Sequence, residues 1–566
     1  MPAYSKFQKL PVHIAEKIAC YIFGCSQDSF PYYGYTIENA QTLPALYEIS
    51  QLWRDIVLRY SCSLIKLTLS AETNAHSWRF LGKHAPAEHN GTNNLLYVKD
   101  VWVKIDRSCL RDAELGLQLL DNSWPSSYTF PSARRLKIEY YDAGCGYDTS
   151  SAEVEDEVIA VIIKRAFSQL PKLQEVYIAC TVNSEHVDNR EYQSIIAHGI
   201  DKVLTMAFLK TKRLNINGIN LWMAKSPLHM YGGVGLTHLV LRGNHNAGIY
   251  QHIIKRNAPT LNTLVVQSGL YSAVQDLLID EGNIIIYPRL ETLELDYFPD
   301  DENAPGHKID KAVAPFPNLN RLCWDGLYPF SDDTLFRGNS STLTYLSMDM
   351  RGKLLQIAQE YKIFYQGSHP KLRHIISTDC YGDPTSEHLD TPTYLQFTLD
   401  LVSPSTQTLG LNTLYKAQTF LREIPQYPHM LNIQVLNMYD SELTLSDIIN
   451  LLKQLPNLTY LETNFGGIGA EIEEIDFNNL INQPYSLHYP LSNYFNCLCV
   501  LVCMENYKHY KSFALAVIVL AVLCPRFTFI SLDKAYQASC LREAKAILAT
   551  KSFSVYSERV QHLFRN

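Results

Sequence analysis

Apolar residues recur along this chain in a pattern that switches between two periods. Stretches with apolar residues three and four positions apart are followed by Pro or another turn residue, and then by leucines at Leu-x-x-Leu spacing. Clear copies of the second part begin at Tyr287, Phe316 and Leu455. The first period predicts amphipathic helices, one of which Ser446 is expected to cap, and the second predicts strands. The chain is therefore expected to repeat one helix–turn–strand unit.

The spacing of these units indicates the kind of repeat. Leucines stand at the first, fourth and sixth positions of one unit (Leu236, Leu239 and Leu241), with an asparagine at the ninth, which resembles the leucine-rich repeat. Intervals between successive strands run from 24 to 40 residues, and the longer ones imply inserted loops. We predict an α/β leucine-rich-repeat solenoid, a horseshoe-like stack of parallel strands and helices. The predicted first positions are Leu136, Leu173, Thr211, Leu236, Leu261, Leu290, Leu319, Leu343, Leu372, Thr406, Ile433, Leu458, Leu498 and Phe527.

Residues 1–62 do not follow the repeat pattern. They contain two helical patterns separated by a polar and aromatic insert at 25–42. The apolar positions of the first pattern are Leu10, Pro11, Ile14 and Ile18, and Pro suits the first turn of a helix. The apolar positions of the second pattern are Leu46, Ile49, Trp53, Ile56 and Val57. Together the two patterns resemble the F-box family, in particular the divergent F-box-like proteins of fungi.

The resemblance implies a small three-helix module that docks on the adaptor subunit of a cullin-based ubiquitin ligase. By the same resemblance, Trp53 would pack inside the module, and the residues that face the adaptor would be Leu10, Pro11, Ile14, Ile18 and Leu46. The alternative is a helical pair that only caps the first repeat, because solenoids need polar-faced terminal caps. In both cases we expect a module at 1–62 and the repeat region at 63–566, where 63–69 and 95–105 supply the first strands.

Length, charge and cysteine use narrow the function classes. The chain has 566 residues, more than one compact core accommodates, and its net charge of −8 argues against a nucleic-acid partner. Its 13 cysteines include no Cys-x-x-Cys pair, and residues 1–10 carry no apolar signal-peptide core. We therefore expect reduced thiols and a cytoplasmic or nuclear location. The apolar run at 513–524 is shorter than the ~20 residues of a membrane span, so we expect a buried repeat helix and no membrane partner.

Candidate chemistry is sparse in this sequence. It contains no phosphate-binding glycine loop and no His-Glu-x-x-His or Gly-x-Ser-x-Gly motif. Cys497 and Cys499 share one predicted strand face, which favours packed thiols over metal ligands. The acidic run at 300–302 is interpreted as a solvated loop, with an acidic rim for a basic partner segment as the alternative. We predict no catalytic residue, no metal site and no cofactor.

The order of the two predicted regions indicates a function. An adaptor-binding module followed by a leucine-rich repeat is the arrangement of substrate-receptor subunits. We therefore expect a non-enzymatic protein-binding subunit of a ubiquitin ligase, whose N-terminal helices bind the adaptor and whose repeat binds an unknown protein target. The alternative is a leucine-rich scaffold with no ubiquitin role, whose first helices only cap the repeat. A third hypothesis, an enzyme within the insertions, has no motif in its favour.

Overall fold

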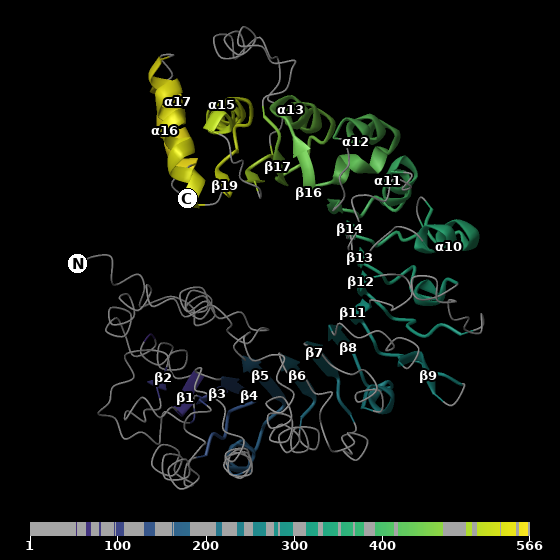
Figure 1. The fold of residues 1–566 in the computed structure, drawn as a ribbon. Helices are drawn as coiled ribbons and strands as arrows, with labels where there is room; N and C mark the ends of the chain where they lie inside the picture. The colour runs from purple at the N-terminus through teal and green to yellow at the C-terminus, as the bar shows by residue number, and fades with distance from the viewer. Residues whose placement is uncertain are drawn as a thin grey trace, which may run out of the picture. The chain divides into compact units, whose positions relative to one another are not determined.

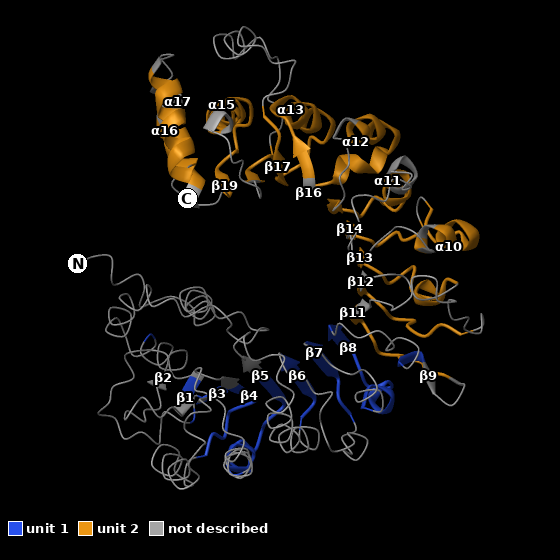
Figure 2. Cartoon of the chain, in the orientation of Figure 1, with its two compact units in different colours: residues 1–280 blue, residues 281–566 orange. Residues whose placement is uncertain are grey.

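Parallel strands laid side by side are the main element of this chain in the computed structural model (Figure 1). The chain divides into two units, residues 1–280 and residues 281–566 (Figure 2). The division falls inside the predicted repeat region, and the predicted boundary at 62/63 lies outside the residues that the structure describes. Those residues are 53, 64–69, 79–80, 96, 98–106, 129–141, 161, 164–181, 211–217, 235–242, 253–267, 277–280, 283–297, 313–326, 332–348, 353–365, 368–377, 391–411, 417–467, 494–500, 507–531, 534–550 and 554–563.

Unit 1 contains parallel strands that pair in a regular register. Val101 of one strand pairs with Leu136 of the next, and Leu136 pairs with Val176 of the one after, so equivalent residues of the repeat face each other. Strand β1 also pairs with β2, in the antiparallel sense. The bounds are β1 Leu64–Leu69, β2 Arg79–Phe80, β3 Asp100–Asp106, β4 Arg135–Tyr141, β5 Glu175–Thr181, β6 Arg213–Asn217, β7 His238–Arg242, β8 Thr263–Gln267 and β9 Ile279–Asp280. The predicted first strands of the repeat region are confirmed as β1 and β3.

Unit 2 has its own run of parallel strands, from β11 to β19, with helices between them. In Figure 1 the helices α10 to α13 and α15 all lie on the same side of these strands. The strands are β10 Asn283–Ile284, β11 Thr292–Tyr297, β12 Arg321–Gly326, β13 Tyr345–Met348, β14 His374–Ser377, β15 Thr408–Leu411, β16 Val435–Leu443, β17 Tyr460–Phe465, β18 Cys497–Val500 and β19 Phe529–Ser531. The helices are η8 Thr334–Phe336, α10 Lys353–Tyr361, α11 Thr391–Asp400, α12 Ala417–Glu423, η9 Ile424–Gln426, η10 Pro428–Asn432, α13 Leu445–Gln454, α15 Tyr507–Leu523, α16 Lys534–Thr550 and α17 Ser554–Leu563.

The core of each unit is built from the fourth position of the repeat. In unit 1 the residues at this position are at most 1% exposed, and they are Ile65, Val101, Leu136, Val176, Leu214, Leu239 and Leu264. In unit 2 they are at most 3% exposed, and they are Leu293, Leu322, Leu346, Ile375, Leu409, Leu436, Leu461, Leu498 and Ile530. Full burial of one such side chain stabilises a fold by about 1.5–3 kcal/mol. Each repeat thus buries its apolar face against the next one, as the leucine-rich pattern requires.

Two of the predicted first positions are wrong by three residues. Leu136 and Leu498 pair with the fourth-position residues Val101 and Leu461, so each is the second leucine of its unit. The first positions are Ala133 and Phe495, both 0% exposed. Ala and Phe fill the pocket that leucine or a residue of similar size fills in other repeats, and a leucine-based pattern does not register them. The other predicted first positions agree with the strand pairing.

A side-chain clamp joins consecutive repeats just before the strands. The buried Asn257 accepts hydrogen bonds from the backbone N–H groups of Gly235 and Leu236, both 2.9 Å long, and donates one to the Ile253 carbonyl. Thr260 donates to the Leu236 carbonyl at 2.7 Å. Gly235 lies at φ +102°, a conformation that favours glycine. In unit 2 the hydroxyls of Thr342 and Thr406 make the equivalent bonds to Leu319 and Leu372.

The helices of unit 2 follow the predicted apolar pattern, with one difference at a cap. Helix α13 starts at Leu445, and its cap is Thr444 rather than Ser446. The Thr444 hydroxyl accepts from the Asp447 N–H at 3.2 Å, and the Asp447 carboxylate accepts from the Thr444 N–H at 3.0 Å. This reciprocal pair satisfies two N–H groups at once, which a single serine does not do.

Helix α15 contains the long apolar run of the sequence. Phe513, Val517 and Leu520 are each at most 4% exposed, which confirms the expected buried repeat helix. Over the described part of the chain, no helix has both the length and the apolar character to cross a membrane.

Candidate functional site

The residues predicted to face a ligase adaptor, namely Leu10, Pro11, Ile14, Ile18 and Leu46, lie outside the residues that the structure describes. The acidic run at 300–302 lies outside them as well. Trp53 is described, and it is helical and fully buried, which agrees with a packing role. Among the described residues, the repeat strands are the surface available for binding.

The second position of the repeat lies at the edge of the sheet where the strands begin. Its backbone joins neighbouring strands, and where the residue is threonine its hydroxyl adds a bond to the preceding strand. The carbonyl of Lys99 accepts the N–H groups of Arg134 and Arg135, at 2.8 and 3.2 Å. The same double acceptor role belongs to Arg134, Gln174, Lys212 and Thr237 in unit 1, and to Glu291, Asn320, Thr344, Arg373, Gln407, Gln434, Thr459 and Asn496 in unit 2. Neighbouring second-position side chains thus emerge one strand spacing apart, about 4.8 Å.

In unit 1 this edge forms a groove rich in cations. The groove has a volume of about 430 Å³ and runs along the starts of β3 to β7. It is lined by Lys99, Asp100, Arg134, Arg135, Gln174, Glu175, Lys212, Arg213 and Thr237, which are second- and third-position residues. The lining therefore contains five cationic side chains and two carboxylates. We call this feature the basic groove.

The two carboxylates of the basic groove compensate its third-position arginines. Asp100 is 4% exposed and forms two hydrogen bonds with the Arg135 guanidinium, from Nε to Oδ1 and from Nη2 to Oδ2 at 2.7 Å. Burial raises the pKa of Glu175, while the charges of Arg135 and Arg213 lower it. The groove thus contains one tight ion pair and one half-buried carboxyl between two arginines.

The second-position cations of the basic groove are the uncompensated ones. Lys99, Arg134 and Lys212 are exposed. Within the described ranges, no carboxylate lies within 4.0 Å of their side chains. The groove therefore carries a surplus of positive charge at its solvent-facing rim.

A stack of cationic and aromatic side chains occupies the fifth position in unit 1. The Trp102 ring lies between two ammonium groups, with Lys66 Nζ 4.2 Å and Lys137 Nζ 4.0 Å from its centroid. Lys137 also lies 5.4 Å from the Tyr177 ring, whose hydroxyl accepts a hydrogen bond from Asn217 at 3.1 Å. Each such cation–π contact is worth about 0.5–2 kcal/mol, depending on exposure. The stack links β1 with β3 to β6, and β3 to β6 also bear the basic groove.

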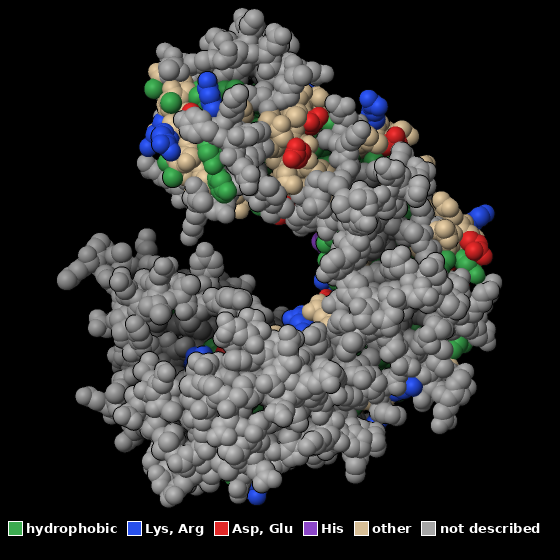
Figure 3. Space-filling view, viewed as in Figure 1, with side chains coloured by type: hydrophobic (Ala, Val, Ile, Leu, Met, Phe, Trp, Pro, Cys, Tyr) green, Lys and Arg blue, Asp and Glu red, His purple; other side chains and the backbone are tan. Residues whose placement is uncertain are grey.

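The corresponding face of unit 2 is aromatic and paired within itself. Arg321 Nε lies 2.9 Å from Glu294 Oε1, and the Arg321 guanidinium lies 3.7 Å from the Tyr345 ring centroid. The Tyr345 ring is 5.7 Å from that of His374, whose Nδ1 is 3.0 Å from the Thr408 hydroxyl. Figure 3 shows acidic and basic side chains interspersed over the helices of this unit. Among the described second-position residues, unit 2 carries one cation, Arg373, where unit 1 carries three.

The cysteines of β18 lie where the sequence predicts. Cys497 and Cys499 are on the same strand face, and Cys499 Sγ is 3.7 Å from Glu462 Oε1. Burial raises the pKa of the Cys497 thiol to about 11, so the protonated thiol is its form at neutral pH. In the described ranges no three His, Cys, Asp or Glu side chains come together as a metal site would require.

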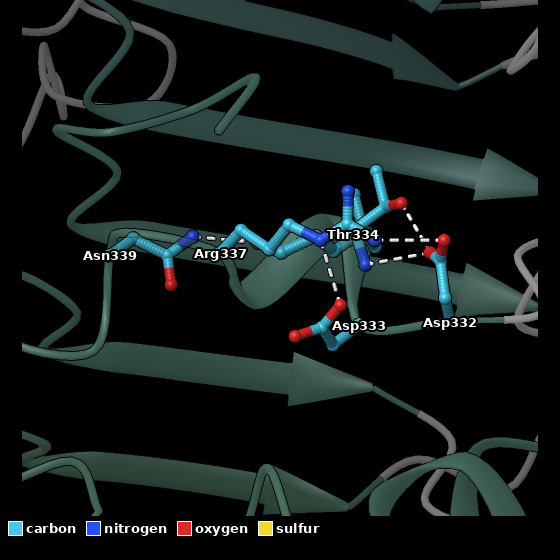
Figure 4. A network of polar contacts seen from close by, with 6 residues as sticks. Asp332, Asp333, Thr334, Arg337 and Asn339 are labelled. Atoms are coloured by element: carbon cyan, nitrogen blue, oxygen red, sulfur yellow. Dashed lines mark hydrogen bonds and ion pairs between the residues drawn. The ribbon is translucent and has the colours of Figure 1, made fainter. Parts of the chain in front are cut away.

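A second polar cluster, in the turn between β12 and β13, serves the fold. Arg337 lies between two carboxylates, 2.8 Å from Asp332 Oδ2 and 2.7 Å from Asp333 Oδ1 (Figure 4). Asp332 also accepts from the N–H and the hydroxyl of Thr334, and it is 2% exposed. Asn339 donates to the Leu335 carbonyl at 2.6 Å. The charges of this cluster are compensated inside the protein, so it stabilises the turn and offers little to a ligand.

The basic groove escaped the sequence analysis because its cations are far apart along the chain. Lys99, Arg134 and Lys212 belong to three different repeats. A usable signal exists in the dibasic pairs 134–135 and 212–213, which occupy the second and third positions of their units. It becomes visible only after the repeats are aligned at the correct first position, Ala133 for the former pair.

Comparisons with known proteins add little to this geometry. No protein-family model matches the chain, and no curated protein matches it. Among solved structures, the yeast complex of Rad7 and Elc1 is similar at 13% identity, over 83% of this chain and 92% of that chain, with a TM-score of 0.32. A protein from Bacteroides fragilis is similar at 10% identity, over 64% and 67%, with a TM-score of 0.20. These scores are too low to inform function, and the leucine-rich-repeat-like fold rests on the strand register and burial described above.

Proposed function

We propose that this protein is a non-enzymatic protein-binding subunit that presents its repeat strands to a partner protein. The observation that supports this function is the row of second-position side chains, most of them exposed, which the backbone bonds of the fold place in register. Surfaces assembled from one side chain per repeat are extended, and repeat proteins use such surfaces to bind other proteins. In unit 1 this row forms part of the basic groove, whose surplus positive charge favours a partner of opposite charge.

We further propose that the N-terminal helices within residues 1–62 bind the adaptor of a cullin-based ubiquitin ligase, so that the bound partner becomes the target of ubiquitin transfer. This part of the proposal rests on the F-box-like sequence pattern of Leu10, Pro11, Ile14, Ile18 and Leu46. The two parts are separable, because protein binding by the repeat does not depend on an adaptor.

The adaptor proposal is tested by co-purification of the full chain with a recombinant ligase adaptor. The variant Leu10→Asp with Ile14→Asp places two carboxylates in the predicted contact and is expected to abolish capture. Lys17→Asp introduces the same group in the same segment, outside the apolar pattern, and is expected to leave capture unchanged. Absence of capture by the unmodified chain, or equal capture by the double variant, would remove the ubiquitin role.

A scaffold with an N-terminal cap is the second candidate, and the burial of Trp53 fits it as well as it fits an F-box-like module. Trp53 is 0% exposed, as expected of a residue that anchors a cap. Under this function, deletion of residues 1–60 lowers the urea midpoint of unfolding and increases binding of a hydrophobic dye, and no adaptor is captured by the full chain. Unchanged stability after the deletion would exclude the capping role.

A further inference from the structure

We propose that the basic groove of unit 1 binds an extended segment of a partner protein rich in aspartate and glutamate. The proposal names the chemistry of the partner and rests on the protein-binding function proposed above. It concerns the groove lined by second- and third-position residues of β3 to β7, at the edge of the sheet where these strands begin.

The groove's second-position cations contribute to the fold through their backbones. The carbonyls of Lys99, Arg134 and Lys212 accept the N–H groups of the next strand, whereas second-position threonines add a hydroxyl bond to the preceding strand. In unit 2 the same position is mostly neutral, with Asn320, Thr344 and Gln434 among its residues. Three cations at this position therefore distinguish unit 1, and their exposure leaves them available to a ligand.

The spacing of these cations fits an extended peptide. From Lys99 on β3 to Lys212 on β6 there are three strand steps, about 14 Å, which about five extended residues cross. The planar guanidinium of Arg134 suits a carboxylate, which it can bind through two parallel hydrogen bonds. Gln174 adds a neutral donor to the groove lining, which suits the carbonyl and side-chain oxygens of the intervening residues.

The groove is poorly suited to nucleic acid. Asp100 and Glu175 place two carboxylates within it, and a phosphate backbone needs an unbroken cationic track. The net charge of the whole chain, −8, also opposes a long polyanion. A peptide is more tolerant, because its acidic side chains can alternate with neutral ones and so avoid the two carboxylates.

The test uses the full chain and a fluorescent synthetic peptide of alternating glutamate and serine, with a glutamine–serine peptide as the neutral control. Binding is measured by fluorescence anisotropy at about 0.01 M and about 0.1 M salt, between which the Debye length falls from about 30 Å to about 10 Å. We expect the acidic peptide to bind more tightly than the neutral one, and its affinity to fall with salt. Equal binding of the two peptides would overturn the proposal.

Matched variants locate the binding. Arg134→Glu with Lys212→Glu is expected to weaken binding of the acidic peptide about tenfold or more, because two attractive charges become repulsive. Arg373→Glu makes one such exchange at the second position of a unit 2 repeat and is expected to have no effect, whereas Arg134→Glu alone, which changes the net charge equally, is expected to weaken binding. Equal losses in the two single variants, or no loss in the double variant, would show that the basic groove is not the site.

Two competitors separate the peptide from other anions. A single-stranded oligonucleotide of similar length, or inorganic phosphate at the same ionic strength, is expected to displace the acidic peptide poorly. Efficient displacement by either one would assign the groove to phosphate chemistry and overturn the proposal. The assay contains no adaptor, so its failure leaves the adaptor result intact, and loss of adaptor capture leaves the peptide result intact.

Discussion

His369 offers the sharpest test of how burial controls charge in this fold. Its ring is 2% exposed and packs against aromatic neighbours, 5.4 Å from the Phe364 ring and 6.3 Å from the Phe336 ring between centroids. Nδ1 lies 2.9 Å from the Ser368 hydroxyl, and Nε2 has no hydrogen-bond partner among the described residues. Burial lowers the pKa of this imidazole from 6.5 to about 4.

The lowered pKa of His369 makes stability depend on pH in a definite direction. Because the folded state disfavours the imidazolium, the unfolded chain binds the proton more tightly between about pH 6.5 and about pH 4. Stability from this residue is therefore complete above the first value and is lost as the pH falls through the window. A difference of about 2.5 pKa units corresponds to about 3 kcal/mol in full, and to about 2.5 kcal/mol at pH 4.5.

The variant His369→Phe removes the titration while keeping an aromatic ring beside Phe336 and Phe364. We expect its free energy of urea unfolding, relative to the unmodified protein, to rise by about 2.5 kcal/mol between pH 7.5 and pH 4.5. Ser368→Ala is the control, since it removes the Nδ1 contact but leaves the imidazole, and it should retain the original pH dependence. A His369→Phe difference that stays constant between the two pH values would refute the assignment of the lowered pKa to His369.

Three further predictions follow from other contacts. Arg337→Met removes the cation between Asp332 and Asp333 and should lower the free energy of urea unfolding by about 3–5 kcal/mol. Adding Asp332→Asn should restore part of this loss. A loss below about 1 kcal/mol would contradict the buried pair. Thr444→Ala removes the cap of α13 and should cost about 1 kcal/mol in the same measurement, whereas an unchanged midpoint would argue against the cap. Cys497 should react with iodoacetamide at about pH 8 roughly two orders of magnitude more slowly than free cysteine, followed by mass spectrometry, and reaction at the free-thiol rate would contradict its raised pKa.

The sequence predicts most of the repeat because leucine is the usual occupant of its inward positions. Leu236, Leu261 and Leu290 mark first positions that the strand pairing confirms, and their periodic burial is what a hydrophobic pattern reports. The pattern fails at Ala133 and Phe495, because the pocket at the first position accepts side chains of different size when neighbouring repeats adjust.

The roles of polar and charged side chains are harder to predict from the sequence. The capping role of Thr444 depends on a reciprocal contact with Asp447, and a single serine two residues later looks equally suitable in the sequence alone. The second-position cations Lys99, Arg134 and Lys212 are 35 residues or more apart in the chain and become neighbours only through strand register. A hydrophobic pattern specifies which residues are buried, whereas the chemistry at the surface depends on how repeats of unequal length align.

The double hydrogen bond at the second position has a consequence for how this protein can change. Since backbone atoms secure each strand start, with an added hydroxyl bond only where the residue is threonine, substitution of a second-position cation alters what the edge recognises at little cost to folding. Specificity can therefore drift, or be redesigned, one repeat at a time, by exchanging Lys99, Arg134 or Lys212 for the neutral residues that unit 2 carries at the same place. The backbone of this edge can therefore stay the same while its side chains, and with them the bound partner, change.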